Sequence, residues 1–339
     1  MTARAKNPLR VGTILCLCFL LSGCVKEPIE VKYRGQVMGT SWSVKVNSNT
    51  GYDSELNGSI QGELDLVDKL MSNWKAESDI SRFNTSEPDS CTEVSAPTLA
   101  VVILAQQMAN LSEGAFDISL GPLIELWGFG TEIQTEGTQP SKDDIFETLA
   151  TTGLEYLYLT DTELCKRNVP LTINVSGLAK GYAVDRVATL LNQREFDNYL
   201  VEVGGELRGK GVNGRGVAWT VGVEQPGDGL ITGEVITAVE LKDGAVATSG
   251  DYRNFYTLDD QRYSHIIDPT TGYPVNHSAA SVSVLATTSI EADAWATALL
   301  VLGPDKGMAI ANQKELAVLM VLRSDQEFEV VTSNAWPKK

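Results

Sequence analysis

The chain has 339 residues and a formal net charge of −17, from 27 basic and 44 acidic side chains. Hydrophobic residues make up 43% and charged residues 21%, a composition that excludes a mostly disordered chain. So acidic a surface repels phosphate backbones, which argues against general nucleic-acid binding. A small anionic ligand would therefore need a local cation, a metal ion or backbone N–H groups at its site.

The N-terminal residues have the pattern of an export signal. Three basic side chains within residues 1–10 precede an apolar run over 11–21, which is too short for an ordinary membrane span. The run ends in Leu-Ser-Gly-Cys, which resembles a bacterial lipobox. We expect residues 1–23 to be a lipoprotein signal peptide, Cys24 to carry the lipid and residues 24–30 to form a tether. An ordinary signal peptide cut near Gly23, without lipidation, is the alternative.

Cleavage before Cys24 removes three of the 27 basic residues and no acidic one, which leaves a net charge of −20. The two other cysteines of the mature chain, Cys91 and Cys165, could pair after export, but nothing in the sequence fixes their distance. The chain has two histidines, His265 and His277, and no Cys-x-x-Cys, so the sequence argues against a zinc site built from Cys and His.

Apolar periodicity in the first half of the chain predicts a strand pair centred on Met38-Gly39-Thr40 and several helices. In chain order, we expect a strand pair over 33–46, a helix over 56–70, a polar turn-rich segment over 72–84, an apolar helix over 97–112 ended by Gly114, a segment over 121–127, an exposed loop over 131–140, a helix from the N-cap Ser141 to Thr152, and strands over 154–159 and 171–175.

The second half of the chain contains more strands. We expect a helix over 177–194, strands over 199–203, 207–212, 219–223, 235–241, 245–249, 263–267 and 281–285, helices over 290–302 and 303–313, and strands over 316–322 and 328–331. The mixed order, without regular βαβ alternation or a repeat of 20–50 residues, predicts an α+β fold. We expect a single compact two-lobed domain over 31–339.

Asp293 and Thr297 are candidate metal ligands. They lie four residues apart in an apolar helix, so they share one helix face. A carboxylate and a hydroxyl are hard oxygen donors that suit Mg²⁺, which also keeps waters and substrate phosphate. The pair alone leaves a structural interpretation open, because Thr often bonds back to a helix carbonyl and Asp293 could cap the helix.

Residues 174–181 read as a strand that enters a helix through Gly177, with Lys180 in the first turn. Helix N-terminal N–H groups and a lysine cation both favour phosphate. The spacing is not that of a P-loop, and a solvated lysine at a strand–turn–helix joint is the structural alternative.

Three further residues could contact a ligand. His265 ends a strand before the Asp-Pro and Thr-Gly turns and could act as a general base or bind phosphate. Trp74 lies in a polar stretch and could stack on a heterocycle, while Asp117, after Gly114-Ala115-Phe116, could accept its hydrogen bonds. Judged singly, these positions are better explained by structural roles: a histidine satisfied by turn backbone in the case of His265, and ordinary core and turn residues in the other two.

Taken in order, these segments resemble the ApbE family of FAD:protein FMN transferases over residues 31–335. Each motif is short, but the ordered set is specific. It comprises Met38-Gly39-Thr40, Ser72-Asn73-Trp74, Gly114-Ala115-Phe116-Asp117, the segment 177–185, Val203-Gly204-Gly205-Glu206, His265-x-x-Asp268-Pro269-x-Thr271-Gly272 and Ala292-Asp293-x-x-x-Thr297.

The resemblance implies the family's ApbE/T-fold-like architecture and a Mg²⁺-dependent transfer of FMN from FAD to a Thr or Ser hydroxyl, with release of AMP. It assigns Asp293, Thr297 and a main-chain oxygen near Gly177 to the metal, and His265 to catalysis. The Trp74 position more often holds Tyr in the family and the Asn174 position often Asp, which leaves the hydrogen-bond role of Asn174 open. Residues implied to line the FAD site are Met38, Trp74, Ala115, Phe116, Asp117, Asn174, Lys180 and Ile267.

The resemblance also implies acceptor flavoprotein subunits, such as those of Rnf-type or sodium-translocating NADH:quinone reductases, at the periplasmic side of the inner membrane. Val25 after Cys24 instead favours the outer membrane by the usual sorting rule. Two other functions are alternatives. A Mg²⁺-dependent FAD pyrophosphatase with water as nucleophile would use the same residues, whereas a flavin-binding lipoprotein without catalysis would not need Asp293 or His265.

Overall fold

The structure is a computed structural model, which describes residues 1–2, 29–130, 139–227, 234–252, 254–259, 261–324 and 327–338. Residues 3–23 of the predicted signal peptide, the predicted lipidation site Cys24 and most of the predicted loop over 131–140 lie outside these ranges. No helix in the described ranges is long and apolar enough to cross a membrane.

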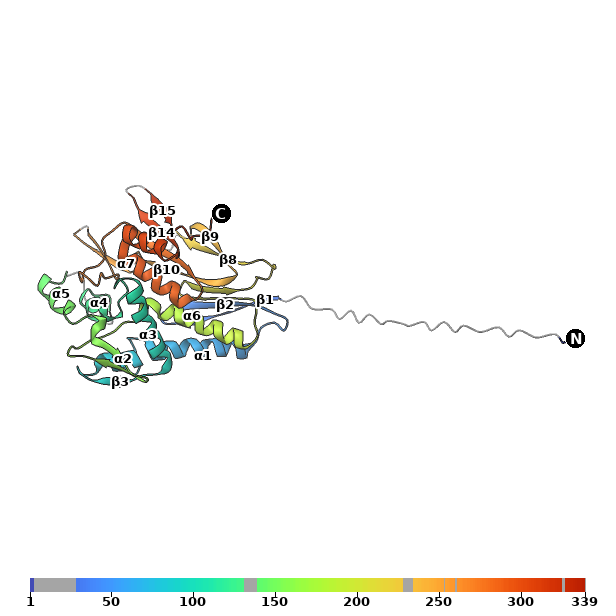
Figure 1. Ribbon diagram of the computed structural model, residues 1–339, viewed down its shortest axis with the longest axis horizontal. Helices are drawn as coiled ribbons and strands as arrows, with labels where there is room; N and C mark the ends of the chain where they lie inside the picture. Colours follow the sequence, from blue (N-terminus) through green and yellow to red (C-terminus); the bar gives the residue numbers. More distant parts are fainter. Residues whose placement is uncertain are drawn as a thin grey trace.

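An eight-stranded sheet, antiparallel throughout, forms the centre of the molecule (Figure 1). Its first two strands alternate buried and exposed residues, which fits a sheet with one face on the core. In spatial order the strands are β1 (Ile29–Val37), β2 (Thr40–Ser48), β6 (Tyr199–Val203), β7 (Glu206–Lys210), β10 (Asp243–Gly250), β13 (Ala279–Ala286), β14 (Ala317–Arg323) and β15 (Phe328–Thr332).

Three long helices cover one face of this sheet (Figure 1). They are α1 (Ser54–Met71), α6 (Ser176–Gln193) and α7 (Ser289–Gln313), joined by α3 (Ala96–Leu111) in one apolar core. The predicted break between helices 290–302 and 303–313 is confirmed, because Gly303 has non-helical backbone angles inside α7. Burying each Val, Leu or Ile side chain of this core contributes roughly 1.5–3 kcal/mol.

The other face of the sheet carries a smaller core. The hairpin β8 (Trp219–Glu224) and β9 (Val235–Leu241) packs there on alternate residues such as Leu200 and Leu319. A third cluster joins α4 (Gly121–Leu126), α5 (Lys142–Leu149) and the hairpin β11 (Phe255–Leu258) and β12 (Gln261–Ser264). The α+β fold is therefore confirmed, and the expected N-cap Ser141 forms a capping box with Asp144.

Several predicted elements were wrong, and short ones were missed. The turn-rich segment 72–84 contains α2 (Asp79–Thr85), the segment 154–159 begins as the 3-10 helix η2 (Leu154–Tyr156) and becomes β4 (Leu157–Leu159), and a further 3-10 helix, η1 (Ile118–Leu120), precedes α4. No strand forms over 171–175, although its odd residues are buried as in a strand.

Side chains take the place of a neighbouring strand at Ile173. Its N–H donates to Asn84 Oδ1 at 2.8 Å, and its carbonyl accepts from the amides of Asn73 at 3.0 Å and Asn84 at 2.9 Å. These hydrogen bonds satisfy the backbone N–H and C=O groups of Ile173 without a neighbouring β-strand.

Cys91 and Cys165 form a disulfide. Cys91 lies in β3 (Cys91–Glu93) and Cys165 in β5 (Glu163–Lys166), and the two residues are opposite each other in the antiparallel pair. With β4, these strands form a separate three-stranded sheet. The pairing that the sequence left open is therefore present in the structure. The chain segment between the two cysteines contains α3, α4 and α5.

Candidate active site

Two adjoining hollows lie where α1, α4, α6 and α7 meet the sheet. The first has a volume of about 580 Å³ and the second about 370 Å³. Phe129, Asn174, Ser176 and Lys180 line both, so the hollows share a wall. Both volumes lie within the range of small-molecule sites.

All twelve residues that the sequence assigned to FAD, metal or catalysis line these hollows. Met38 and Trp74 line the first, and Asn174 and Lys180 line both. The second is lined by Ala115, Phe116, Asp117, Gly177, His265, Ile267, Asp293 and Thr297. Their positions agree with a common site, whereas Cys24 lies outside the described residues.

Asp293 is placed by a close crossing of α6 and α7. A Cβ on Gly181 would lie 2.4 Å from the Ser289 carbonyl oxygen, so only glycine permits this approach. The Gly181 N–H then donates to Asp293 Oδ2 at 2.9 Å. Asp185 caps the start of α7 by accepting from the N–H groups of Ser289 at 3.0 Å and Ile290 at 2.9 Å.

Two buried carboxylates face one lysine in the second hollow. Lys180 Nζ lies 2.6 Å from Glu206 Oε1 and 4.0 Å from Asp293 Oδ1. Burial raises the pKa of Asp293 to about 7, with Lys180 lowering it and Glu206 raising it. The three charges leave a net negative site, which favours a bound cation.

Oxygen atoms gather beside Asp293. The hydroxyls of Thr297 and Ser249 lie 3.1 Å apart. Gly177 lies near Thr297, since a Cβ added to the glycine would be 3.5 Å from the threonine hydroxyl oxygen. Helical spacing explains why Asp293 and Thr297 share this face, and Ser249 comes from the facing strand β10.

His265 follows β12 and is held by the backbone of Asn254. The backbone N–H of His265 donates to the Asn254 carbonyl at 3.2 Å, and the ring Nδ1 of His265 lies 3.0 Å from the same oxygen. A carbonyl oxygen only accepts, so Nδ1 carries the hydrogen and Nε2 keeps its lone pair. Burial lowers the pKa of His265, which favours the neutral ring.

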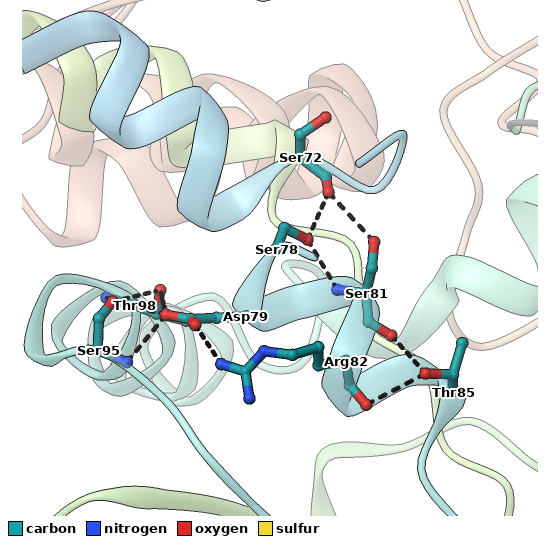
Figure 2. A network of polar contacts seen from close by, with 8 residues as sticks. All are labelled: Ser72, Ser78, Asp79, Ser81, Arg82, Thr85, Ser95 and Thr98. Atoms are coloured by element: carbon teal, nitrogen blue, oxygen red, sulfur yellow. Dashed lines mark hydrogen bonds and ion pairs between the residues drawn. The ribbon is translucent and has the colours of Figure 1, made fainter. Parts of the chain in front are cut away.

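Trp74 lies at the rim of the first hollow and is 69% exposed. Its loop is held by α2, because Ser78 and Ser81 donate to the Ser72 carbonyl at 2.7 and 3.3 Å (Figure 2). The exposed indole is thus carried on a fixed backbone.

Asp79, the first residue of α2, joins this helix to the start of α3. Its buried carboxylate accepts from Ser95 Oγ at 2.6 Å, Thr98 Oγ1 at 2.7 Å and Arg82 at 2.6 Å (Figure 2). These bonds lower the pKa of Asp79 in spite of the opposing effect of burial.

Asn174 and Asp117 support neighbouring turns. Asn174 Oδ1 accepts from the Ser176 N–H at 2.9 Å at the start of α6, and Asp117 Oδ1 accepts from the Ser119 N–H at 2.7 Å. Burial raises the pKa of Asp117. Asp117 has a second oxygen that can accept from a ligand's N–H or O–H groups, and the Nδ2 amide of Asn174 can donate to a ligand acceptor.

Glu206, Ser249 and Phe129 are among the residues of the hollows that were not predicted as site residues. The Val-Gly-Gly-Glu segment marked Glu206 as part of the family pattern but suggested no chemistry. Ser249 sits in an ordinary strand, and Phe129 follows α4 without any motif. Only the fold brings these residues to the hollows.

The family model described as "ApbE family" matches residues 38–320. The chain belongs to the ApbE family. Among ApbE relatives, an "FAD:protein FMN transferase" of Vibrio cholerae is 40% identical over 324 residues, which cover 95% of this chain and 96% of that protein. An "FAD:protein FMN transferase" of Escherichia coli K12 is 36% identical, and the match covers 94% of each chain.

The ApbE fold is equally clear from solved structures. "Flavin Transferase ApbE from Vibrio cholerae" matches with a TM-score of 0.83 at 39% identity, covering 91% of this chain and 98% of that one. The apo form of Pseudomonas stutzeri flavinyl transferase ApbE matches with a TM-score of 0.83 at 37% identity, covering 91% and 96%.

Proposed function

We propose that this FAD:protein FMN transferase attaches FMN to a Thr or Ser hydroxyl of an acceptor protein. The second hollow supports this proposal most directly, because Lys180, His265, Asp293 and Thr297 all line it. Two large hollows that meet at Lys180 suit a dinucleotide, with its phosphates at the shared wall and its two ring systems apart.

The residues present fit a divalent cation. Asp293 supplies a buried carboxylate and Thr297 a hydroxyl, and the backbone of Gly177 lies near that threonine. Oxygen donors of this kind are those that Mg²⁺ prefers. We assign Asp293, Thr297 and the main-chain oxygen near Gly177 to Mg²⁺, which when bound would neutralise charge on the phosphates as a Lewis acid.

Lys180 and His265 perform complementary tasks in this proposal. The acceptor hydroxyl oxygen forms a bond to the phosphorus on the FMN side of FAD, and the bond from that phosphorus to the bridging oxygen breaks. AMP leaves with the bridging oxygen, and the hydroxyl proton passes to His265 Nε2. Lys180, at the wall between the hollows, holds phosphate charge in a protein whose net charge otherwise repels it.

The flavin and adenine ends would take different surroundings. We assign the first hollow, with Met38 and the exposed ring of Trp74, to the isoalloxazine, which can stack on an indole. Ala115, Phe116, Asp117 and Ile267 would receive the adenine, with Asp117 accepting a hydrogen bond from the exocyclic amine.

Product analysis tests the reaction. The protein is incubated with FAD and Mg²⁺, with and without an acceptor fragment, and free FMN and AMP are measured by chromatography. The proposal expects AMP to form with acceptor present while free FMN does not accumulate. Steady release of both FMN and AMP without acceptor would instead identify an FAD pyrophosphatase, and FAD binding without any turnover would identify a flavin-binding protein.

We further propose that the protein is exported and anchored through lipid on Cys24. The Cys91–Cys165 disulfide supports export, because disulfides persist in oxidising compartments. Acceptors would be flavoprotein subunits exposed on the same side of the membrane, such as those of Rnf-type or sodium-translocating quinone reductases.

A further inference from the structure

Glu206 is a charged group of the second hollow to which the proposed function gives no role. It begins β7 directly after the Gly204-Gly205 turn, and its side chain is 2% exposed. Its Oε1 accepts from Lys180 Nζ at 2.6 Å, whereas Oε2 is buried without a hydrogen-bond partner among the described residues. Burying a carboxylate with one oxygen unpartnered costs folding free energy, so packing does not account for this residue.

Glu206 and Asp293 compete for the same ammonium. Lys180 Nζ lies 2.6 Å from the Glu206 carboxylate but 4.0 Å from that of Asp293, which is beyond hydrogen-bond reach. Both carboxylates are buried, so charge interactions between these groups are stronger than in water. The Glu206 side chain therefore determines which of the two carboxylates forms the close ion pair with Lys180.

We propose that Glu206 is a positioning residue that holds the Lys180 ammonium off Asp293 and so keeps the Asp293 carboxylate available to the divalent cation. This inference rests on the metal site of the proposed function. Without the charge of Glu206, Asp293 is the nearest carboxylate to Lys180, and the ammonium and the metal ion compete for it. The same contact keeps Lys180 at the wall shared by the two hollows, where it meets phosphate.

Calorimetric titration with Mg²⁺ alone tests the inference on the full-length protein without FAD. Glu206→Gln keeps the side-chain shape and removes the charge, and we expect it to weaken Mg²⁺ binding by about tenfold, equivalent to about 1.4 kcal/mol. Glu202→Gln is the matched control. Glu202 lies on β6 of the same hairpin, accepts from the Gly205 N–H at 3.0 Å, and does not line the second hollow, so its loss should leave the affinity unchanged.

A double-mutant cycle with Lys180→Met separates positioning from direct charge. If Glu206 acts by holding Lys180, Glu206→Gln has little further effect on Mg²⁺ affinity once the lysine is gone. An equal loss in both backgrounds would overturn the proposal, because Glu206 would then act by its own charge or as a ligand. Unchanged affinity in the single variant would overturn it too.

Folding and the parent proposal are checked in parallel. Melting curves report whether each variant folds, and Glu206→Asp, which keeps the charge but shortens its reach, replaces Glu206→Gln if the latter does not. With Glu206→Asp, affinity should fall only while Lys180 is present. FMN transfer by the wild type is measured alongside, because its absence would reject the proposed function, whereas wild-type transfer with no coupling between Glu206 and Lys180 rejects the role of Glu206 alone.

Discussion

His265 and Trp74 occupy opposite environments at the scale of single residues. His265 is half-buried, and both its N–H and its ring contact one carbonyl, that of Asn254. Trp74 is 69% exposed at the rim of the first hollow. Removing each side chain therefore removes a different thing: a proton acceptor in one case and a stacking surface in the other.

The first prediction contrasts these two residues. His265→Ala should lower single-turnover FMN transfer by roughly 10²–10⁴, the usual worth of a positioned general base, while FAD affinity stays close to that of the wild type. Trp74→Ala should weaken FAD binding and change transfer at saturating FAD far less. Stopped-flow transfer and fluorescence titration measure the two effects. A stably folded His265→Ala enzyme within tenfold of the wild-type rate would remove His265 from the catalytic residues.

The sequence predicted single residues of the site better than their contacts. Residues with distinctive chemistry, such as Asp293 and Lys180, were found from short motifs. The partner of Lys180 was not, because Glu206 comes from a different strand and its pairing depends on how α6 packs on β7. Nor could the sequence show that Nδ1 of His265 faces a carbonyl, which decides its tautomer.

At the scale of elements, the crossing of α6 and α7 sets the position of the proposed metal ligand Asp293. Gly181 lets the backbones approach, and Asp185 joins the helices by capping α7 while pairing with Arg208 at 2.5 Å. Any side chain at Gly181 must push α7 away from α6. That movement would carry Asp293 away from the Gly181 N–H.

The second prediction compares two glycines in helices. Gly181→Ala should destabilise the fold by about 1–3 kcal/mol, because its Cβ would meet backbone atoms of α7 that cannot turn aside. Gly58→Ala in α1, where a Cβ has no neighbour within 4 Å, should instead stabilise by up to ~1 kcal/mol. Thermal unfolding measures both. Equal effects of the two substitutions would contradict the described crossing.

Lys166 links the disulfide-bonded sheet to residues 84–86 at the end of α2, and these residues contact the segment that leads to Asn174. It is 1% exposed on β5, and its ammonium donates to the carbonyls of Asn84 at 3.0 Å and Ser86 at 2.8 Å. Asn84 in turn holds Ile173, the residue before Asn174. Burial lowers the pKa of Lys166 from 10.5 to about 8.

The third prediction follows from this pKa. Between pH 8 and 10.5 the unfolded chain keeps the Lys166 proton that the folded chain has released, so unfolding takes up a proton and rising pH favours the folded state. The free energy of unfolding of the wild type, relative to Lys166→Met, should therefore rise from pH 7.5 to 9.5, by at most ~1.4 kcal/mol per pH unit. Urea denaturation at several pH values measures it. A flat or falling difference would show that Lys166 titrates normally.

Long elements were predictable from sequence and short ones were not. The helices α1, α3 and α6 carry enough apolar repeats to define a period, and their bounds came out within a few residues. β3 has three residues and α2 has seven, too few for a period. The buried alternation over 171–175 was read as a strand because sequence cannot reveal that the amides of Asn73 and Asn84 replace the neighbouring strand.

At the scale of the whole molecule, the net charge bears on the proposed membrane anchor. A mature chain of net charge −20 would be repelled by an anionic membrane surface, so electrostatics does not explain membrane attachment. No helix in the described part of the chain could span a bilayer. Attachment would therefore depend on the lipid at Cys24, where several acyl chains hold far more firmly than one.

The fourth prediction tests this anchor. Cys24→Ser removes the thiol that would carry the lipid, so the protein should move from the membrane fraction to the soluble or unprocessed fraction. Immunoblots of fractionated cells and the mass of the N-terminal peptide measure the change. A wild-type protein that is fully soluble, with no lipid mass on Cys24, would contradict the lipoprotein assignment.

In the proposed reaction, FMN moves from FAD to an acceptor hydroxyl at a metal site built on Asp293. Peptide mass spectrometry of an acceptor fragment co-expressed with the protein tests it most directly. We predict an FMN phosphoester on a single Thr or Ser with the wild type, and its loss with Asp293→Ala at unchanged expression and fold. An unmodified acceptor with the wild type, or full modification by Asp293→Ala in the presence of EDTA, would contradict the account.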